Sequence, residues 1–147
     1  MSLSKKNYES LASFRYILRT FLRFSEQAAG SVGLSASQHQ ALLAIQGYPG
    51  RSQITVGELA ERLQVEHHSA VGLVDRLEAN QFVQRTPHPE DRRSVLISLT
   101  AEGLRFLDQL AKVHRQELKK IGPELRSILQ KLESEITSEN DSPDKEV

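Results

Sequence analysis

Two short groups of polar side chains in this 147-residue chain could recognise another molecule. The first group is His67-His68-Ser69, with Val71 and Gly72 close behind, and the second is Asp91-Arg92-Arg93. Histidine and serine can hydrogen-bond bases or phosphates, and valine can contact a thymine methyl group. Arginine is the side chain favoured in a narrow, electronegative minor groove of DNA. These residue types indicate nucleic-acid recognition rather than a chemical reaction.

The chain lacks the usual groupings of catalytic and metal-binding residues. It has no nucleophile–base pairing, no glycine-rich phosphate loop and no carboxylate dyad at workable spacing. It has no cysteines, which excludes disulfides, thiolate metal sites and a cysteine-based oxidant sensor within this chain. The histidines are scattered, as at His39 and the His114/Glu117 pair, whereas metal sites need several convergent ligands. We therefore expect no enzyme activity, no metal and no cofactor.

Composition alone does not favour nucleic acid as a partner. The formal net charge is zero, and a strongly basic domain would have been better evidence for DNA binding. Residues 1–8 are polar, unlike a signal peptide, and no later segment is apolar enough to span a membrane. We expect a soluble cytoplasmic protein. Its length suits one compact domain, or a small module with helical extensions.

The first polar group lies on a predicted helix-turn-helix. Thr55 and Glu58 form a capping box at the start of one helix, and a short turn follows at Leu63 to Val65. A second helix is predicted over residues 67–79, with one apolar stripe made of Ala70, Leu73, Val74 and Leu77. With that stripe turned inward, the opposite face is free to enter a major groove. The residues expected on this face are His67, His68, Ser69, Val71, Gly72 and, one turn later, Arg76.

The glycine at position 72, inside the second predicted helix, can be interpreted in two ways. In the middle of a helix it costs about 1 kcal/mol relative to alanine. Its missing side chain would let the helix sit deep in the groove. Alternatively, it is a tolerated glycine on an exposed face, and the residues leave both readings open.

The second polar group lies at the tip of a predicted hairpin. Residues 82–85 and 95–99 are β-branched and apolar enough to be strands, and Pro87 and Pro89 mark the loop between them. This loop presents Arg92 and Arg93. Asp91 would repel phosphate, but it can accept hydrogen bonds that orient an arginine or pin the loop to the neighbouring helix. The alternative is an exposed, solvated charge cluster.

Long helices with apolar stripes are predicted at both ends of the chain. The first covers residues 8–29 and is ended by Gly30 and Gly33; Ser35 and Gln38 then form a capping box for the next helix. Another long helix follows Thr100, is broken by Gly122-Pro123, and is succeeded by a last helix that reaches Ile136. Because apolar stripes must be covered, we expect the two ends to pack together and against a second copy, as a symmetric dimer. A monomer whose ends cover each other is the alternative.

The order of these features resembles the MarR family of bacterial transcriptional regulators over nearly the whole chain. The segments that carry the resemblance are Leu34 to Gln38, Leu73-Val74-Asp75-Arg76-Leu77-Glu78, Asp91-Arg92-Arg93 and Thr100-Ala101-Glu102-Gly103. The resemblance implies a winged helix-turn-helix homodimer that binds a palindromic operator in double-stranded DNA. Such proteins are usually repressors, often released by a small aromatic ligand. By position, Arg93 matches the family's minor-groove arginine and Asp91 its loop-anchoring aspartate.

The stripes, the composition and the resemblance together predict the organisation of the chain. We predict a mainly α protein with a small antiparallel β-wing. Residues 1–34 would form an N-terminal dimerisation helix, 35–100 the DNA-binding domain, 101–136 the C-terminal dimerisation helices, and 137–147 a disordered tail.

The helix-helix turn, a ligand pocket and an alternative function complete the expectations. Gln64 departs from the family, which usually has glycine in the helix-helix turn, and a left-handed backbone there is costly for other residues. If a ligand pocket exists, we expect it near Tyr16, Arg19, His39 and His114. The alternative function is a winged-helix module that binds another protein and no DNA.

Overall fold

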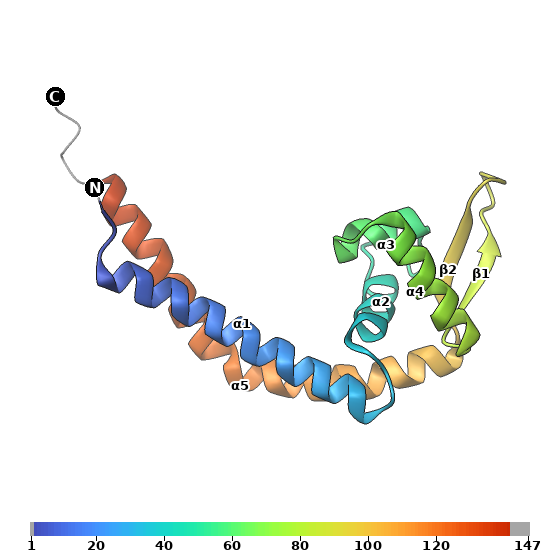
Figure 1. Cartoon of the computed structure of the whole chain (residues 1–147), viewed down its shortest axis with the longest axis horizontal. Coiled ribbons are helices and arrows are strands. Elements are labelled where there is room, and N and C mark those ends of the chain that lie inside the picture. The colour runs from blue at the N-terminus through green and yellow to red at the C-terminus, as the bar shows by residue number, and fades with distance from the viewer. Residues whose placement is uncertain (1, 142–147) are drawn as a thin grey trace. The chain divides into compact units, whose positions relative to one another are not determined.

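The computed structural model describes residues 2–141, and within this range the chain forms five helices and two strands (Figure 1). In chain order they are α1 (Lys5–Ser31), α2 (Ala36–Gln46), α3 (Val56–Leu63), α4 (His67–Ala79), β1 (Val83–Pro87), β2 (Val95–Leu99) and α5 (Ala101–Asn140). The predicted fold class, mainly α with a small antiparallel sheet, is confirmed. The chain divides into two compact units. Unit 1 joins the chain up to Ser25 with the chain from His114 onward, and unit 2 is Glu26–Val113.

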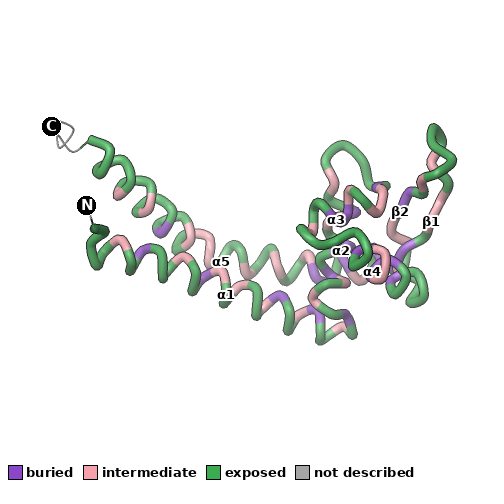
Figure 2. Tube along the Cα trace, turned by 45° about the horizontal axis from the view of Figure 1, so that its top comes forward, coloured by how far each residue is buried: buried purple, intermediate pink, exposed green. Residues whose placement is uncertain are grey.

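Unit 2 is built around one apolar core to which α2, α3, α4, β2 and α5 contribute. The fully enclosed large side chains are Leu42, Ile45, Ile54, Leu59, Val74, Leu77, Ile97 and Leu110. Burying a side chain of this size contributes about 1.5–3 kcal/mol. The buried residues of α4 are Ala70, Leu73, Val74 and Leu77, which confirms the predicted stripe. Because this face is held in the core, the opposite face of α4 is turned outward (Figure 2).

The helix ends of unit 2 follow the capping residues closely. Ser35 with Gln38, and Thr55 with Glu58, form the two predicted capping boxes, at the starts of α2 and α3. α1 ends at Ser31, where Gly33 has a left-handed φ of 83° and the Leu34 amide donates to the Ala29 carbonyl at 2.9 Å. This arrangement satisfies the last carbonyls of the helix. Gly33 therefore ends α1 as predicted, whereas Gly30 lies within the helix.

The wing, defined as β1, β2 and the loop between them, is an antiparallel hairpin in which Val83 pairs with Leu99 and Pro87 with Val95. The prediction that Thr86 and Pro87 belong to the loop is wrong, because both are in β1. Pro87 is tolerated there because it ends an edge strand, where no ladder N–H is required of it. On the other side of β2, Ile54 and Ile97 exchange backbone hydrogen bonds of 3.1 and 2.8 Å.

The C-terminal part of the chain differs from the prediction in two ways. α5 continues through Gly122-Pro123 to Asn140, so the predicted break is wrong. One reason is that Gly122 has no Cβ to clash with the Pro123 ring, which removes part of the usual penalty for a helical residue before proline. The predicted tail 137–147 is helical at 137–140, where the Thr137 hydroxyl donates to the Glu133 carbonyl at 2.9 Å. Residues 142–147 of that predicted tail lie outside the described residues.

Unit 1 consists of the beginning of α1 and the later part of α5, held together by polar and aromatic contacts. Ser10 is buried and its hydroxyl donates to Glu135 Oε1 at 2.8 Å. At the other end of the unit, His114 Nε2 lies 2.8 Å from Ser25 Oγ, and the His114 ring meets the Phe21 and Phe24 rings edge-on. No helix in the described part of the chain is long and apolar enough to cross a membrane.

The junction of α4, β1 and α5 is held by backbone contacts around Phe82. Gln81 has a left-handed φ of 63°, and the Phe82 amide donates to the Leu77 carbonyl at 2.9 Å, which turns the chain out of α4. The Thr100 amide donates to the Phe82 carbonyl at 3.0 Å, and the Thr100 hydroxyl donates to the Gln81 carbonyl at 2.6 Å. A Cβ added at Gly103 would lie 2.1 Å from the Phe82 carbonyl oxygen. Only glycine therefore lets α5 begin this close to the foot of the wing.

We predict that Gly103→Ala destabilises the protein by about 1–3 kcal/mol or more, because the added methyl group must displace backbone atoms. Urea denaturation followed by circular dichroism measures this loss. Gly30→Ala is the matched control, since Gly30 is helical and nothing lies within 4 Å of the added carbon. Equal stability of the two variants would contradict the close approach at Phe82.

Candidate nucleic-acid interface

The outward face of α4 carries the residues predicted to read DNA. His67, His68, Ser69 and Arg76 are exposed, while Val71 and Gly72 are half-buried. The N-cap residue, Glu66, makes no side-chain cap hydrogen bond to α4. The helix N-terminus therefore remains available to an anion such as phosphate, which backbone N–H groups and the helix dipole both favour.

Gln64 connects α3 to α4 in a left-handed conformation, with φ 55° and ψ 48°. This is the conformation for which glycine would be expected, so the departure noted in the sequence falls on a backbone that costs about 1–2 kcal/mol for other residues. The Gln64 side chain offsets part of that cost, because its Nε2 donates to the Glu61 carbonyl at 2.7 Å. The turn thus keeps its left-handed shape with a less favourable residue.

We predict that Gln64→Gly raises the free energy of unfolding by about 0.5–1 kcal/mol, because relief of the left-handed strain exceeds the extra chain entropy of glycine. Chemical denaturation at several urea concentrations gives the value. Gln40→Gly is the control, because Gln40 is an exposed residue inside α2 and glycine should destabilise there. A less stable Gln64→Gly protein would show that the side-chain hydrogen bond outweighs the strain.

The structure supplies no internal packing reason for Gly72. An added Cβ would have ordinary contact with Arg76 Nη1, at 3.5 Å, which is the end of a flexible side chain. Gly72 also lies on the half-exposed side of α4, between the helix N-terminus and Arg76. Both interpretations of this glycine, close approach to a ligand and tolerance on an exposed face, agree with this surrounding.

We predict that Gly72→Ala increases stability by up to about 1 kcal/mol and at the same time weakens DNA binding. The first effect comes from helix propensity, and the second from a methyl group that keeps α4 from seating in the groove. Thermal denaturation and fluorescence anisotropy with labelled duplex measure them separately. Unchanged affinity would identify Gly72 as a tolerated glycine.

The wing tip is ordered by hydrogen bonds within the loop. Asp91 Oδ1 accepts from the Arg93 backbone N–H at 2.9 Å, and the Asp91 carbonyl accepts from the Ser94 amide at 3.2 Å. His88 Nδ1 accepts from the Glu90 amide at 3.1 Å. Asp91 thus holds the backbone that carries Arg93, and both Arg92 and Arg93 are exposed. None of the hydrogen bonds described for residues 2–141 joins the Asp91 carboxylate to α4.

Sequence reasoning missed Arg85, which links the wing to α4. Its Nη2 lies 2.6 Å from Asp75 Oδ1 and its Nη1 lies 2.8 Å from Glu78 Oε1. The hydrogen bond with Asp75 is the main reason that the pKa of Arg85 is raised above its ordinary value. No local motif marks the residue, because its partners are on a different element. Its spacing from Asp75 and Glu78 has meaning only once the hairpin lies beside α4.

A second arginine group lies beside the first helix of the helix-turn-helix. Arg51 and Arg62 each place their guanidinium 4.9 Å from the centre of the Tyr48 ring, and Arg51 also pairs with Glu58. Burial raises the pKa of Glu58. The Thr55 backbone N–H, the Tyr48 hydroxyl and the Arg51 charge outweigh burial and leave that pKa below its usual value. These contacts join the segment before α3 to both the first and the last turn of that helix.

The four residues predicted to line a ligand pocket are divided between the two units. Tyr16, Arg19 and His114 belong to unit 1, and His39 is a buried residue of α2 in unit 2. Tyr16 and Arg19 are exposed.

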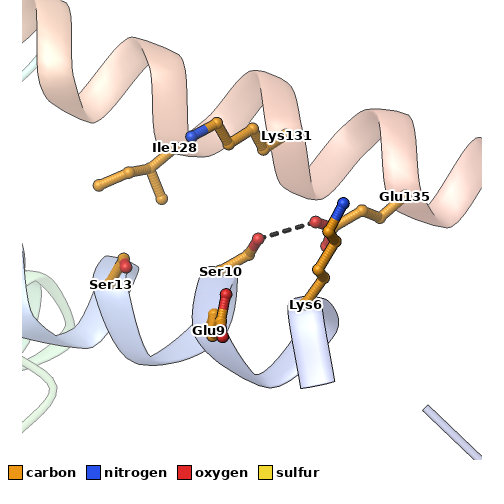
Figure 3. Close-up of a pocket in the computed structure, with 7 residues that line it drawn as sticks. All are labelled: Lys6, Glu9, Ser10, Ser13, Ile128, Lys131 and Glu135. Carbon is orange, nitrogen blue, oxygen red and sulfur yellow. Dashed lines mark hydrogen bonds between the residues drawn. The ribbon is translucent and has the colours of Figure 1, made fainter. Parts of the chain in front are cut away.

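A cavity of about 430 Å³ lies within unit 1, lined by Lys6, Glu9, Ser10, Ser13, Ile128, Lys131 and Glu135 (Figure 3). None of the four predicted residues is among them, and Ile128 is the one apolar side chain in the lining. Pockets for drug-sized aromatic molecules are mostly apolar, so this cavity is poorly suited to such a ligand. Across residues 2–141, no three histidine or acidic side chains gather in a way that could hold a metal ion.

A MarR family profile matches residues 32–94. The transcriptional repressor NicR of Pseudomonas putida is 34% identical over 91 residues, which are 62% of this chain and 56% of NicR. The transcriptional activatory protein BadR of Rhodopseudomonas palustris is 31% identical over 86 residues, 58% of this chain and 49% of BadR. The matched segment thus spans about half the length of these curated relatives.

Among solved structures, the chain is similar to a mutant MarR from Escherichia coli complexed with operator DNA. The TM-score is 0.64 at 26% identity, and the match covers 80% of this chain and 89% of that one. The fold and the exposed face of α4 beside an arginine-tipped hairpin define a winged helix-turn-helix protein. Residues 32–94 match the MarR family, and the fold is similar to that of the MarR structure.

Proposed function

We propose that this protein is a sequence-specific DNA-binding transcriptional regulator that acts as a homodimer in the cytoplasm. The observation that carries the proposal is the pairing, within unit 2, of an exposed α4 N-terminal face with an exposed arginine loop. The face would enter the major groove of a double-stranded operator, and Arg93 the adjacent minor groove. The MarR structure solved on operator DNA supports this reading.

The dimer is supported by apolar surface that unit 1 leaves uncovered. Several large apolar side chains there are at least 40% exposed, namely Tyr8, Leu11, Tyr16, Leu22, Leu118, Leu129 and Ile136. Leu11 and Leu22 belong to the α1 stripe that a partner is expected to cover. Soluble proteins rarely leave so much apolar surface open on one pair of helices unless another molecule covers it. A second copy, related by a two-fold axis, would match a palindromic operator with half-sites about one DNA turn apart.

The neutral net charge is compatible with DNA binding because part of the acidic charge is paired within unit 2. Glu58 pairs with Arg51, and Asp75 and Glu78 both pair with Arg85. None of the ion pairs described for residues 2–141 involves Arg76, Arg92 or Arg93. Those three arginines supply local positive charge at the proposed interface, and binding should weaken steeply as salt is raised.

Repression, and release by a small aromatic ligand, are finer parts of the same proposal. NicR is named a repressor and BadR an activatory protein, so relatives of similar identity differ in output. The residues that we assign to effector response are Tyr16, Arg19 and His114 of unit 1 and His39 of unit 2, each considered within its own unit. Mapping protected bases at the protein's own promoter, with and without aromatic acids, tests both parts. Intact release after alanine replacement of the four residues would refute the assignment.

We predict that Arg93→Ala weakens binding to the protein's own promoter DNA by about 1–3 kcal/mol, because the side chain proposed to enter the minor groove is lost. The protein should stay folded, since Arg93 is exposed at the wing tip. Anisotropy titration at several salt concentrations measures affinity and salt slope. Arg105→Ala is the control, since Arg105 is an exposed α5 residue paired with Glu102. Equal affinity of Arg93→Ala and the wild type would refute the assignment of Arg93 to the minor groove.

The alternative is a winged-helix module that binds another protein. The same titration separates the two: no retardation of promoter DNA at low salt, together with an intact fold, would favour the module. An enzyme is disfavoured by the relatives, which are named as regulators of transcription.

A further inference from the structure

The contact between the wing and α4 is a fork of three charged side chains. Arg85 stands in the middle of β1, and its guanidinium contacts Asp75 at 2.6 Å and Glu78 at 2.8 Å. Asp75 and Glu78 are three residues apart, so they project from one face of α4. One planar guanidinium bonded through two nitrogens to two carboxylates constrains both distance and orientation.

On the face of the hairpin that carries Arg85, the fork lies where the apolar packing of the wing ends. Along one face of β1, Val83 is 2% exposed, Arg85 is half-buried and Pro87 is exposed. Arg85 is paired across the hairpin with Ile97, which is fully buried, whereas Pro87 is paired with the exposed Val95. On the other face of the hairpin, Leu96 is the last buried residue before the tip, so beyond it the arm that carries Arg92 and Arg93 has little core to hold it. The fork is the outermost ionic attachment of this arm to α4 among the described ion pairs.

The fork is too exposed to matter chiefly as a source of stability. The side chains of Asp75 and Glu78 are 60% and 43% exposed, and ion pairs at such positions contribute little to folding. Their position is more informative, because both carboxylates are on the helix that is proposed to enter the major groove. The fork joins the two elements that the proposed function requires to contact one DNA molecule together.

We propose that Arg85 is a positioning residue for DNA binding, which holds the wing arm against α4 through Asp75 and Glu78 so that Arg93 and the α4 face engage neighbouring grooves at once. The inference rests on the proposed function. Arg85 itself touches no base or phosphate in this scheme. Its contribution reaches the DNA through Arg93.

A competing role for the same contacts is purely electrostatic. Arg85 would then only neutralise two carboxylates that repel phosphate. The two roles predict opposite outcomes for Asp75→Asn and Glu78→Gln, which remove the repelling charge and also weaken the fork. Positioning predicts lower affinity for DNA, and neutralisation predicts equal or higher affinity.

The main experiment is a double-mutant cycle in the full-length protein. Affinity for a labelled duplex from the protein's own promoter is measured for wild type, Arg85→Met, Arg93→Ala and the double variant. We expect Arg85→Met to weaken binding about ten-fold, within the range of coupling energies for residues of one network. The cycle should be strongly non-additive, because Arg93→Ala costs little once the arm is released. The three variants should then share one reduced salt slope.

Matched variants separate positioning from loss of charge or of fold. Arg85→Lys should restore part of the affinity, since one ammonium group bonds both carboxylates less well. Arg105→Met removes an equally charged side chain from a surface pair and should bind as the wild type does. If Arg85→Met fails to fold by circular dichroism, the Asp75→Asn/Glu78→Gln protein replaces it in the cycle, with Arg85 still present.

The arm can also be followed without DNA. Because the chain has no cysteine, spin labels can be placed at Glu90→Cys on the wing and Gln40→Cys on α2, both exposed positions of unit 2. We expect the distance distribution between them to broaden in Arg85→Met. An unchanged distribution, or additive losses in the cycle, would overturn the inference while wild-type binding stands. Absence of wild-type binding to the duplex would overturn the proposed function and this inference together.

Discussion

Burial of one face of α4 is the constraint on which the rest of unit 2, the proposed DNA-binding unit, depends. Leu73, Val74 and Leu77 are held in a core that also contains Leu59 of α3 and Ile97 of β2. Because one face of α4 is buried, the residues on its opposite face must be the ones that point outward. The left-handed Gln81 then turns the chain out of α4, and the hairpin begins two residues later. The polar contacts of the unit refine positions that the apolar core has already set.

The chain changes direction at two points beside α4, and each relies on an unusual backbone. Gln64 precedes the helix and Gln81 follows it, both with positive φ. At the second point, Gly103 and Thr100 bring α5 against the Phe82 carbonyl, so three elements meet within a few residues. The foot of the wing is thus held by backbone geometry, while its arm is held by the Arg85 fork. The two supports differ in kind, and they act on different parts of the same hairpin.

Much of this fold could be predicted from local patterns, because its signals are local. The capping boxes at Ser35 and Thr55 and the apolar stripe of α4 involve residues three or four apart, and all were predicted correctly. The errors lie at two prolines, where the usual effect of proline on a helix or a strand was offset by its surroundings. A proline usually ends a helix, but at Pro123 the neighbouring Gly122 lets α5 continue, and Pro87 remains in a strand because that strand is an edge.

For the candidate site, the outward face of α4 followed from its apolar stripe. Arg85 could not be found this way, because its partners are seven and ten residues away on another element.

The α4 helix separates the residues that hold it from those that face outward. Its anchors are the buried stripe and the carboxylates of Asp75 and Glu78. Among the hydrogen bonds and ion pairs described for residues 2–141, none uses the side chains of His67, His68 or Ser69. Substitution at those three positions therefore leaves every described side-chain support of the helix in place. A scaffold of this kind can exchange a few surface residues on its outward face, with its folding left essentially as it was.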